Sequence, residues 1–154
     1  FSSRRRHTRF RNVTWSSDVC SSDLGIDNTP TQEHTINMMH LGENIYDKVR
    51  EHFNAPIYVS SGYRSKKLNS AMKGASNSQH CTGQAMDLDM DGRGISNKDI
   101  FKFIADNLLF DQLIWEFGTA ENPDWVHVSY KNSGNRGQVL KAVKGILGTK
   151  YVPM

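Results

Sequence analysis

The 154-residue sequence lacks the features that mark a membrane protein or a disulfide-stabilised secreted domain. It contains no apolar run close to the roughly 20 residues that a membrane-spanning helix needs, so we expect no transmembrane segment. Its two cysteines are too few for a disulfide framework and indicate no cellular compartment. Internal repeats and low-complexity tracts are absent as well. The remaining composition, with 23% charged and 10% aromatic residues, is typical of one globular domain with a buried core.

The excess of basic charge is confined to the first 24 residues. This segment carries five arginines and two aspartates, whereas the other 130 residues are neutral, with 14 basic and 14 acidic side chains. Its strings SSRRRHTR and WSSDVCSSDL resemble the translated halves of a common short-read sequencing adapter. We therefore expect residues 1–24 to be a non-native, disordered segment, residues 25–154 to form the domain, and the natural N-terminus to be missing. On that basis Cys81 is the only native cysteine, and nucleic acid is not an expected partner.

The apolar spacing after residue 24 predicts an α+β fold in which a small antiparallel sheet is flanked by helices. Thr29 and Pro30 fit the cap and first turn of a helix, and Ser96 with Asp99 fits the cap of another. The first helix is expected to bury a stripe formed by Ile36, Met39, Tyr46, Val49 and Phe53. The other expected elements are strands at 56–60, 85–90, 112–117 and 125–130, helices at 65–74 and 138–147, and a loop at 74–83.

Two of these strands, 85–90 and 125–130, alternate strictly between apolar and polar residues. If the apolar faces of both strands pack on helices, Asp87 and His127 project from the opposite face of the sheet. His80 lies at the end of the loop that leads into the first strand. Two imidazoles and one carboxylate would leave a coordination position for water, as in catalytic zinc sites. For any one of the three residues taken alone, an ordinary loop or strand role is the better interpretation.

A further carboxylate stands three residues before His127. Asp124 follows Pro123 at the start of the strand, which would hold it near a metal bound there. A carboxylate beside a metal-activated water can take its proton and later return it to the leaving amine. An acidic loop residue by itself carries little information.

Three motifs occur in order along the chain: SGYRS at 61–65, SQHCTGQAMDLD at 78–89 and DWVHVSY at 124–130. Together they resemble the zinc D-Ala-D-Ala carboxypeptidase and phage endolysin peptidase family. This family includes the vancomycin-resistance dipeptidases and shares the hedgehog-like fold. The GIDNTP opening and the GNRGQVL segment are similar to its phage-type branch, so the resemblance extends from Gly25 to about Leu147.

The resemblance implies one catalytic Zn²⁺ and assigns roles to several residues. Asp124 is the implied general base, although some members of the family have Glu or His at that position. Arg64 is the implied group that stabilises the oxyanion or grips a substrate carbonyl or carboxylate. Ser78 corresponds to a substrate-contacting serine, although a plain loop serine fits nearly as well. The implied metal ligands are His80, Asp87 and His127.

Other residues near these motifs have weaker claims. Cys81 adjoins His80, and since neighbouring residues rarely point at the same metal, we leave it out of the ligand set. Asp89 is expected to lie behind the ligands or to face solvent. Glu116 is a candidate for the wall of the cleft, and Trp115 and Trp125 fit a cleft wall or the core.

The function implied is that of a zinc metallopeptidase which hydrolyses peptidoglycan stem peptides, of the D-Ala-D-Ala carboxypeptidase type. Two alternatives stay open: an L-Ala-D-Glu endopeptidase like those of phage endolysins, and a non-catalytic zinc-binding module. The expected partner is a peptidoglycan peptide, and the chain is expected to be a monomer. A phage enzyme would be made in the bacterial cytoplasm and act at the cell wall, whereas a bacterial one would be periplasmic or secreted.

Overall fold

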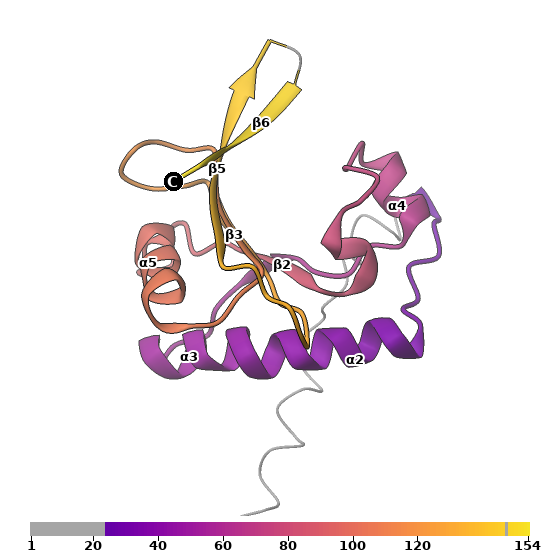
Figure 1. Ribbon diagram of the computed structural model, residues 1–154, viewed down its shortest axis with the longest axis horizontal. Coiled ribbons are helices and arrows are strands. Elements are labelled where there is room, and N and C mark those ends of the chain that lie inside the picture. The colour runs from indigo at the N-terminus through magenta and orange to yellow at the C-terminus, as the bar shows by residue number, and fades with distance from the viewer. Residues whose placement is uncertain (1–23, 147) are drawn as a thin grey trace, which may run out of the picture.

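The computed structural model describes residues 24–146 and 148–154, and within them the chain forms one sheet with helices packed on it (Figure 1). The sheet has six strands in the order β1-β2-β4-β3-β5-β6. All neighbouring strands are antiparallel except β3 and β5, which are parallel. The predicted α+β class is therefore confirmed. The strands are β1 (Val59–Ser61), β2 (Ala85–Leu88), β3 (Gln112–Glu116), β4 (Trp125–Ser129), β5 (Gln138–Gly145) and β6 (Gly148–Pro153).

The helices lie in three places around this sheet (Figure 1). A long helix consists of α2 (Gln32–Leu41), a π-helical turn η2 (Gly42–Tyr46) and α3 (Asp47–Phe53). Two short elements, α4 (Lys66–Ala71) and the 3-10 helix η3 (Gln79–Thr82), follow β1, and α5 (Asn97–Asn107) follows β2. None of the described helices is long and apolar enough to cross a membrane. The predicted segment 1–24 lies outside the described residues apart from Leu24.

The first helix begins two residues later than predicted. Its N-cap is Thr31, whose side chain accepts a hydrogen bond from the backbone of His34, while His34 accepts one from Thr31 in return. Thr29 instead donates its hydroxyl to Asp27 at 2.6 Å, so it is occupied in a local turn and cannot cap.

The predicted apolar stripe of this helix is right only in its second half. Ile36 and Met39 are exposed, because this end of the helix lies against η3 through polar contacts such as Asn37 to the Thr82 carbonyl at 2.9 Å. Further along, the helix packs on the sheet and buries its apolar side chains. These are Leu41, Ile45, Tyr46 and Val49.

The hydrophobic core lies between one face of the sheet and the helices. The α5 helix is capped as predicted, with the Ser96 hydroxyl accepting from the Asp99 backbone at 3.0 Å. Each fully buried Leu or Ile contributes about 1.5–3 kcal/mol to folding, so this layer stabilises the sheet against the helices. The core residues without exposed surface are Leu41, Ile45, Val49, Met86, Leu88, Ile100, Ile104, Leu113, Val126 and Val128.

The helix predicted at 138–147 is wrong, because residues 138–145 form strand β5. Leu140, Val143 and Ile146 recur at helical spacing, and Gly148 looked like a helix C-cap. In the fold, β5 pairs with β3 on one side and with β6 on the other, and these long-range hydrogen bonds override the local pattern. The strand predicted at 56–60 is shifted to 59–61, and the other predicted strands and helices are present with shorter bounds. The loop predicted at 74–83 contains η3.

Candidate metal centre

Strands β2 and β4 place a carboxylate and an imidazole side by side. Asp87 and His127 are direct partners in the antiparallel register, so their side chains project from the same face. The residues on either side of this pair, Met86 with Val128 and Leu88 with Val126, are fully buried in the core. The prediction that Asp87 and His127 share the open face of the sheet is confirmed by this register.

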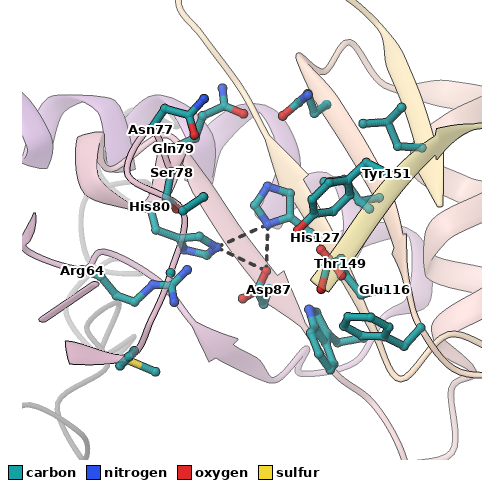
Figure 2. A pocket seen from close by; sticks show the side chains of 18 of the residues that line it. Arg64, Asn77, Ser78, Gln79, His80, Asp87, Glu116, His127, Thr149 and Tyr151 are labelled. Atoms are coloured by element: carbon teal, nitrogen blue, oxygen red, sulfur yellow. Dashed lines mark hydrogen bonds and ion pairs between the residues drawn. The ribbon is translucent and has the colours of Figure 1, made fainter. Parts of the chain in front are cut away.

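His80 reaches the same point from η3. Its side chain is 2% exposed, and its Nδ1 donates to the Gly62 carbonyl at 2.7 Å. With the proton on Nδ1, the lone pair of Nε2 faces the other two side chains. Nε2 lies 3.3 Å from Nδ1 of His127 and 3.3 Å from Oδ1 of Asp87 (Figure 2). The hydrogen bond to the Gly62 carbonyl therefore fixes the ring so that Nε2 is available to bind a metal.

The spacing of the three donor atoms fits a tetrahedral metal. Two atoms that each lie about 2.0–2.1 Å from a tetrahedral zinc are roughly 3.3 Å apart. The two distances from His80 match this value, and Nδ1 of His127 is 2.9 Å from Oδ1 of Asp87. Two imidazoles and one carboxylate are also the donor types that zinc prefers. His80, Asp87 and His127 therefore could hold Zn²⁺ with one position left for a substrate or water.

The carboxylate of this cluster is held in its charged form. Burial by itself would raise the pKa of Asp87, but its interactions with the imidazoles of His80 and His127 outweigh that effect and hold the pKa well below its usual range. Asp87 is therefore a charged oxygen donor at all physiological pH values.

A cavity of about 600 Å³ opens over this cluster and is lined by residues from several elements. Arg64 and Ser78, two of the predicted site residues, lie on one side of it, and Glu116 and Tyr151 lie on the other (Figure 2). The backbone of Arg64 donates to the His80 carbonyl at 3.2 Å, which ties this arginine to the metal cluster. Its Nε is buried without a hydrogen-bond partner among the described residues. Such a group is suited to receive an oxygen of a bound substrate.

Asp124 does not lie where its predicted role requires. Its side chain is exposed and is not part of the cavity lining. The residues at the start of β4 that line the cavity are Trp125 and His127. Because side chains alternate between the two faces of a strand, the preceding Asp124 does not share their face. The backbone of Asp124 is held by two hydrogen bonds. Its amide donates to the backbone carbonyl of Glu116 at 2.9 Å, and its carbonyl accepts from the Asn97 side chain at 3.0 Å.

Glu116 lies in the cavity wall, as the sequence suggested. It ends β3 opposite Trp125 and is only 6% exposed. Burial raises its pKa to about 7, with a smaller opposing effect of His127 and a smaller raising effect of Asp87.

Cys81 and Asp89, which lie close in sequence to the predicted ligands, are not part of the metal cluster. Cys81 is buried away from the metal cluster, and burial raises the pKa of its thiol. Asp89 accepts from the Asp91 backbone at 3.0 Å and from Asn97 at 3.2 Å, so it organises the turn after β2. Of the two tryptophans, Trp115 packs in the core and Trp125 lines the cavity.

The β5–β6 hairpin supplies wall residues that the sequence did not reveal, because its first strand was predicted as a helix. Leu140, Thr149 and Tyr151 line the cavity from this hairpin. A usable signal existed: Gly145 and Gly148 flank a two-residue connection, and the segment TKYV that follows is rich in β-branched and aromatic residues.

An open set of two histidines and one aspartate beneath a cavity is the arrangement of a catalytic zinc site rather than of a closed structural one. The Peptidase M15 family matches residues 13–129, which is about three quarters of the chain. The protein belongs to the Peptidase M15 family, whose members are zinc-dependent peptidases. No curated protein matches the sequence. The matched segment contains β1 to β4 and ends before the β5–β6 hairpin.

Proposed function

We propose that this protein hydrolyses the stem peptides of peptidoglycan as a zinc-dependent peptidase of the D-Ala-D-Ala carboxypeptidase type. The observation that carries the proposal is the convergence of the His80, Asp87 and His127 donor atoms next to the buried Nε of Arg64, which has no hydrogen-bond partner within the described part of the chain. A carboxypeptidase must hold a scissile carbonyl and a terminal carboxylate close together. A metal site beside a guanidinium whose buried Nε can donate to a substrate oxygen meets both needs.

The residues around the cluster have distinct tasks in this proposal. When bound, Zn²⁺ supplies Lewis acidity at the scissile carbonyl and lowers the pKa of a water molecule. Arg64 holds an oxygen of the substrate, and the hydroxyl of Ser78 offers a hydrogen bond to the peptide backbone. Phe117 and Trp125, packed edge to face, form an apolar wall that limits the access of bulk water.

A polar groove of about 320 Å³ favours the endopeptidase alternative. It shares Asn77, Ser78, Gln79 and Gln112 with the cavity, and it continues to Lys131 and Arg136. A longer acidic peptide would gain room and positive charge there, as an L-Ala-D-Glu endopeptidase needs. Both alternatives place the enzyme at the bacterial cell wall, as expected of a phage lytic enzyme or an exported bacterial one.

The direct test uses the full chain, loaded with Zn²⁺, on intact and on predigested peptidoglycan, with a chelated sample as the control. Mass spectrometry of the products identifies the bond that is cut. Loss of a single terminal alanine that stops on chelation supports the carboxypeptidase, and release of whole stem peptides supports the endopeptidase. Stoichiometric zinc binding without any product would contradict both and would favour the non-catalytic module.

A further inference from the structure

Glu116 occupies the position in the sheet from which a carboxylate reaches the space above the metal cluster. In the antiparallel register of β3 and β4, Ile114 pairs with His127 and Glu116 pairs with Trp125. Paired residues share a face, so Glu116 and His127 are diagonal neighbours on the cavity side, roughly 7–8 Å apart at the backbone. A glutamate side chain spans most of that separation, and Glu116 lines the same cavity as Asp87 and His127 (Figure 2).

The side chain of Glu116 has no structural partner. It is 6% exposed, and among the described residues its carboxylate makes neither a hydrogen bond nor an ion pair. Asp111, a buried acid directly before β3, shows what a structural carboxylate needs: it is bound by Arg136, Lys131 and Gln79. Burying a carboxylate without such partners is costly. An unpaired acid in a cavity wall is therefore better explained by an interaction with a bound substrate than by a role in folding.

The charged and titratable groups around Glu116 agree with a role in proton exchange. Asp87, His127 and the hydroxyl of Tyr151 interact electrostatically with it, and no lysine or arginine of residues 24–146 or 148–154 forms an ion pair with it. The nearest lysines of β5 lie over aromatic rings instead, Lys141 over Trp115 and Lys144 over Phe117. Without a cationic partner among the described residues, the Glu116 carboxylate is available both to accept and to donate a proton.

We propose that Glu116, and not Asp124, is the catalytic acid–base residue of the peptidase reaction; this inference rests on the proposed function. Its carboxylate takes one proton from the attacking water as the new carbon–oxygen bond forms at the scissile carbonyl. The same proton then passes to the amide nitrogen as the carbon–nitrogen bond breaks and the amine leaves. The second proton of the water is released from the new carboxyl group, so the step needs no other reactant.

The experiment compares three isosteric substitutions in the full, zinc-loaded chain: Glu116→Gln, Asp124→Asn and, as a matched control, Glu43→Gln on the exposed face of η2. We expect E116Q to lower kcat by roughly 100- to 10,000-fold, the usual contribution of a general acid–base group. D124N and E43Q should stay within about three-fold of the unsubstituted protein. Zinc stoichiometry and peptide affinity, both measured by calorimetry, should be unchanged in E116Q, because the glutamate neither ligates the metal nor anchors the substrate.

Each other outcome decides against a particular claim. Turnover by E116Q within ten-fold of the unsubstituted protein, loss of its zinc, or a large loss in D124N alone would overturn the assignment of Glu116. If E116Q does not fold, Glu116→Asp keeps the charge on a shorter side chain and should retain a measurable fraction of the activity; wild-type turnover in E116D would also overturn it. Absence of turnover in the unsubstituted protein would instead remove the proposed function itself.

Discussion

At the scale of single residues, two buried carboxylates differ in how the fold treats them. Asp111 has no exposed surface and is bound by Arg136 through its backbone amide and two guanidinium nitrogens, by Lys131 at 2.9 Å and by Gln79 at 2.9 Å. Burial would raise its pKa, but these hydrogen bonds and charges hold the pKa well below its usual range. Lys131 and Arg136 follow β4, and Gln79 directly precedes the metal ligand His80. Asp111 binds all three and therefore connects the segment after β4 to the metal cluster. Glu116 has no such partners among the described residues and stays available for chemistry.

Asp111→Asn should destabilise the protein at neutral pH and flatten its response to acid. Removing one partner of a buried ion pair costs about 3–5 kcal/mol, and since Arg136 is half exposed we expect roughly 2–3 kcal/mol in the free energy of unfolding. The folded-state pKa is lowered, so this stabilisation is present above the unfolded value near 3.9 and is lost as the pH falls through the folded value. The unsubstituted protein should therefore lose more stability than D111N between about pH 5 and pH 3.

Urea unfolding followed by circular dichroism across this pH range measures the difference. Asp106→Asn, which changes an exposed aspartate of α5, is the control and should behave as the unsubstituted protein. Some acid sensitivity persists in D111N because the pKa of Asp87 is lowered as well. Equal pH slopes for D111N and the unsubstituted protein would contradict the proposed contribution of Asp111.

At the scale of elements, the β5–β6 hairpin forms a cavity wall outside the segment that matches the family. In Figure 1 the hairpin projects beyond the helices, and β6 is exposed along its whole length. Side chains of β6 alternate between its two faces, so Tyr151 lines the cavity and the neighbouring Val152 does not. The hairpin therefore lies where it can contact a substrate in the cavity, but it supplies none of the three metal donors.

Tyr151→Ala should weaken substrate binding without affecting the metal. An aromatic side chain that contacts substrate contributes on the order of 1 kcal/mol, so we expect KM to rise roughly five-fold while kcat changes little. Val152→Ala is the matched control on the opposite face of the same strand. Steady-state kinetics with the peptide identified by mass spectrometry, together with zinc analysis, separates the effects. A fall in kcat with constant KM would show that Tyr151 acts in the chemical step instead.

At the scale of the whole molecule, the metal cluster joins three separate parts of the fold. His80 comes from η3, Asp87 from β2 and His127 from β4. Binding a metal to the folded state alone stabilises that state by mass action, by about 2.7 kcal/mol when free zinc is 100-fold above its Kd. The unfolded chain cannot bring the three donors together, so metal binding and folding are coupled.

Zinc should therefore raise the thermal midpoint of the protein, and a chelator should lower it. For a domain of this size the expected rise in Tm is about 5–10 °C at 100-fold excess over Kd. Differential scanning calorimetry of the unsubstituted protein and of His127→Ala, each with zinc and with chelator, makes the comparison within each protein. The zinc-induced shift should vanish in H127A, and a shift of equal size there would contradict the ligand set.

The local pattern of the sequence determined the parts of this protein that depend on short-range chemistry. Strict alternation in residues 85–90 and 125–130 identified which side chains face the core and made Asp87 and His127 candidates for the open face. The donor set of His80, Asp87 and His127 was implied by the resemblance of three motifs to a known family. The Ser96 cap was likewise visible because a capping bond spans only three residues. The alternation and the cap each need only the geometry of one strand or one helix turn.

Only the tertiary structure decided which carboxylate accompanies the metal cluster and what closes the cavity. Asp124 is nearer to His127 in sequence, but strand alternation directs it away, whereas the pairing of β3 with β4 brings Glu116 to the cavity. Residues 138–145 carry a helical spacing, but pairing with β3 and β6 makes them a strand, and Tyr151 becomes a wall residue as a result. The physical reason is the same in both cases: sheet pairing joins residues distant in sequence, and no local propensity encodes it.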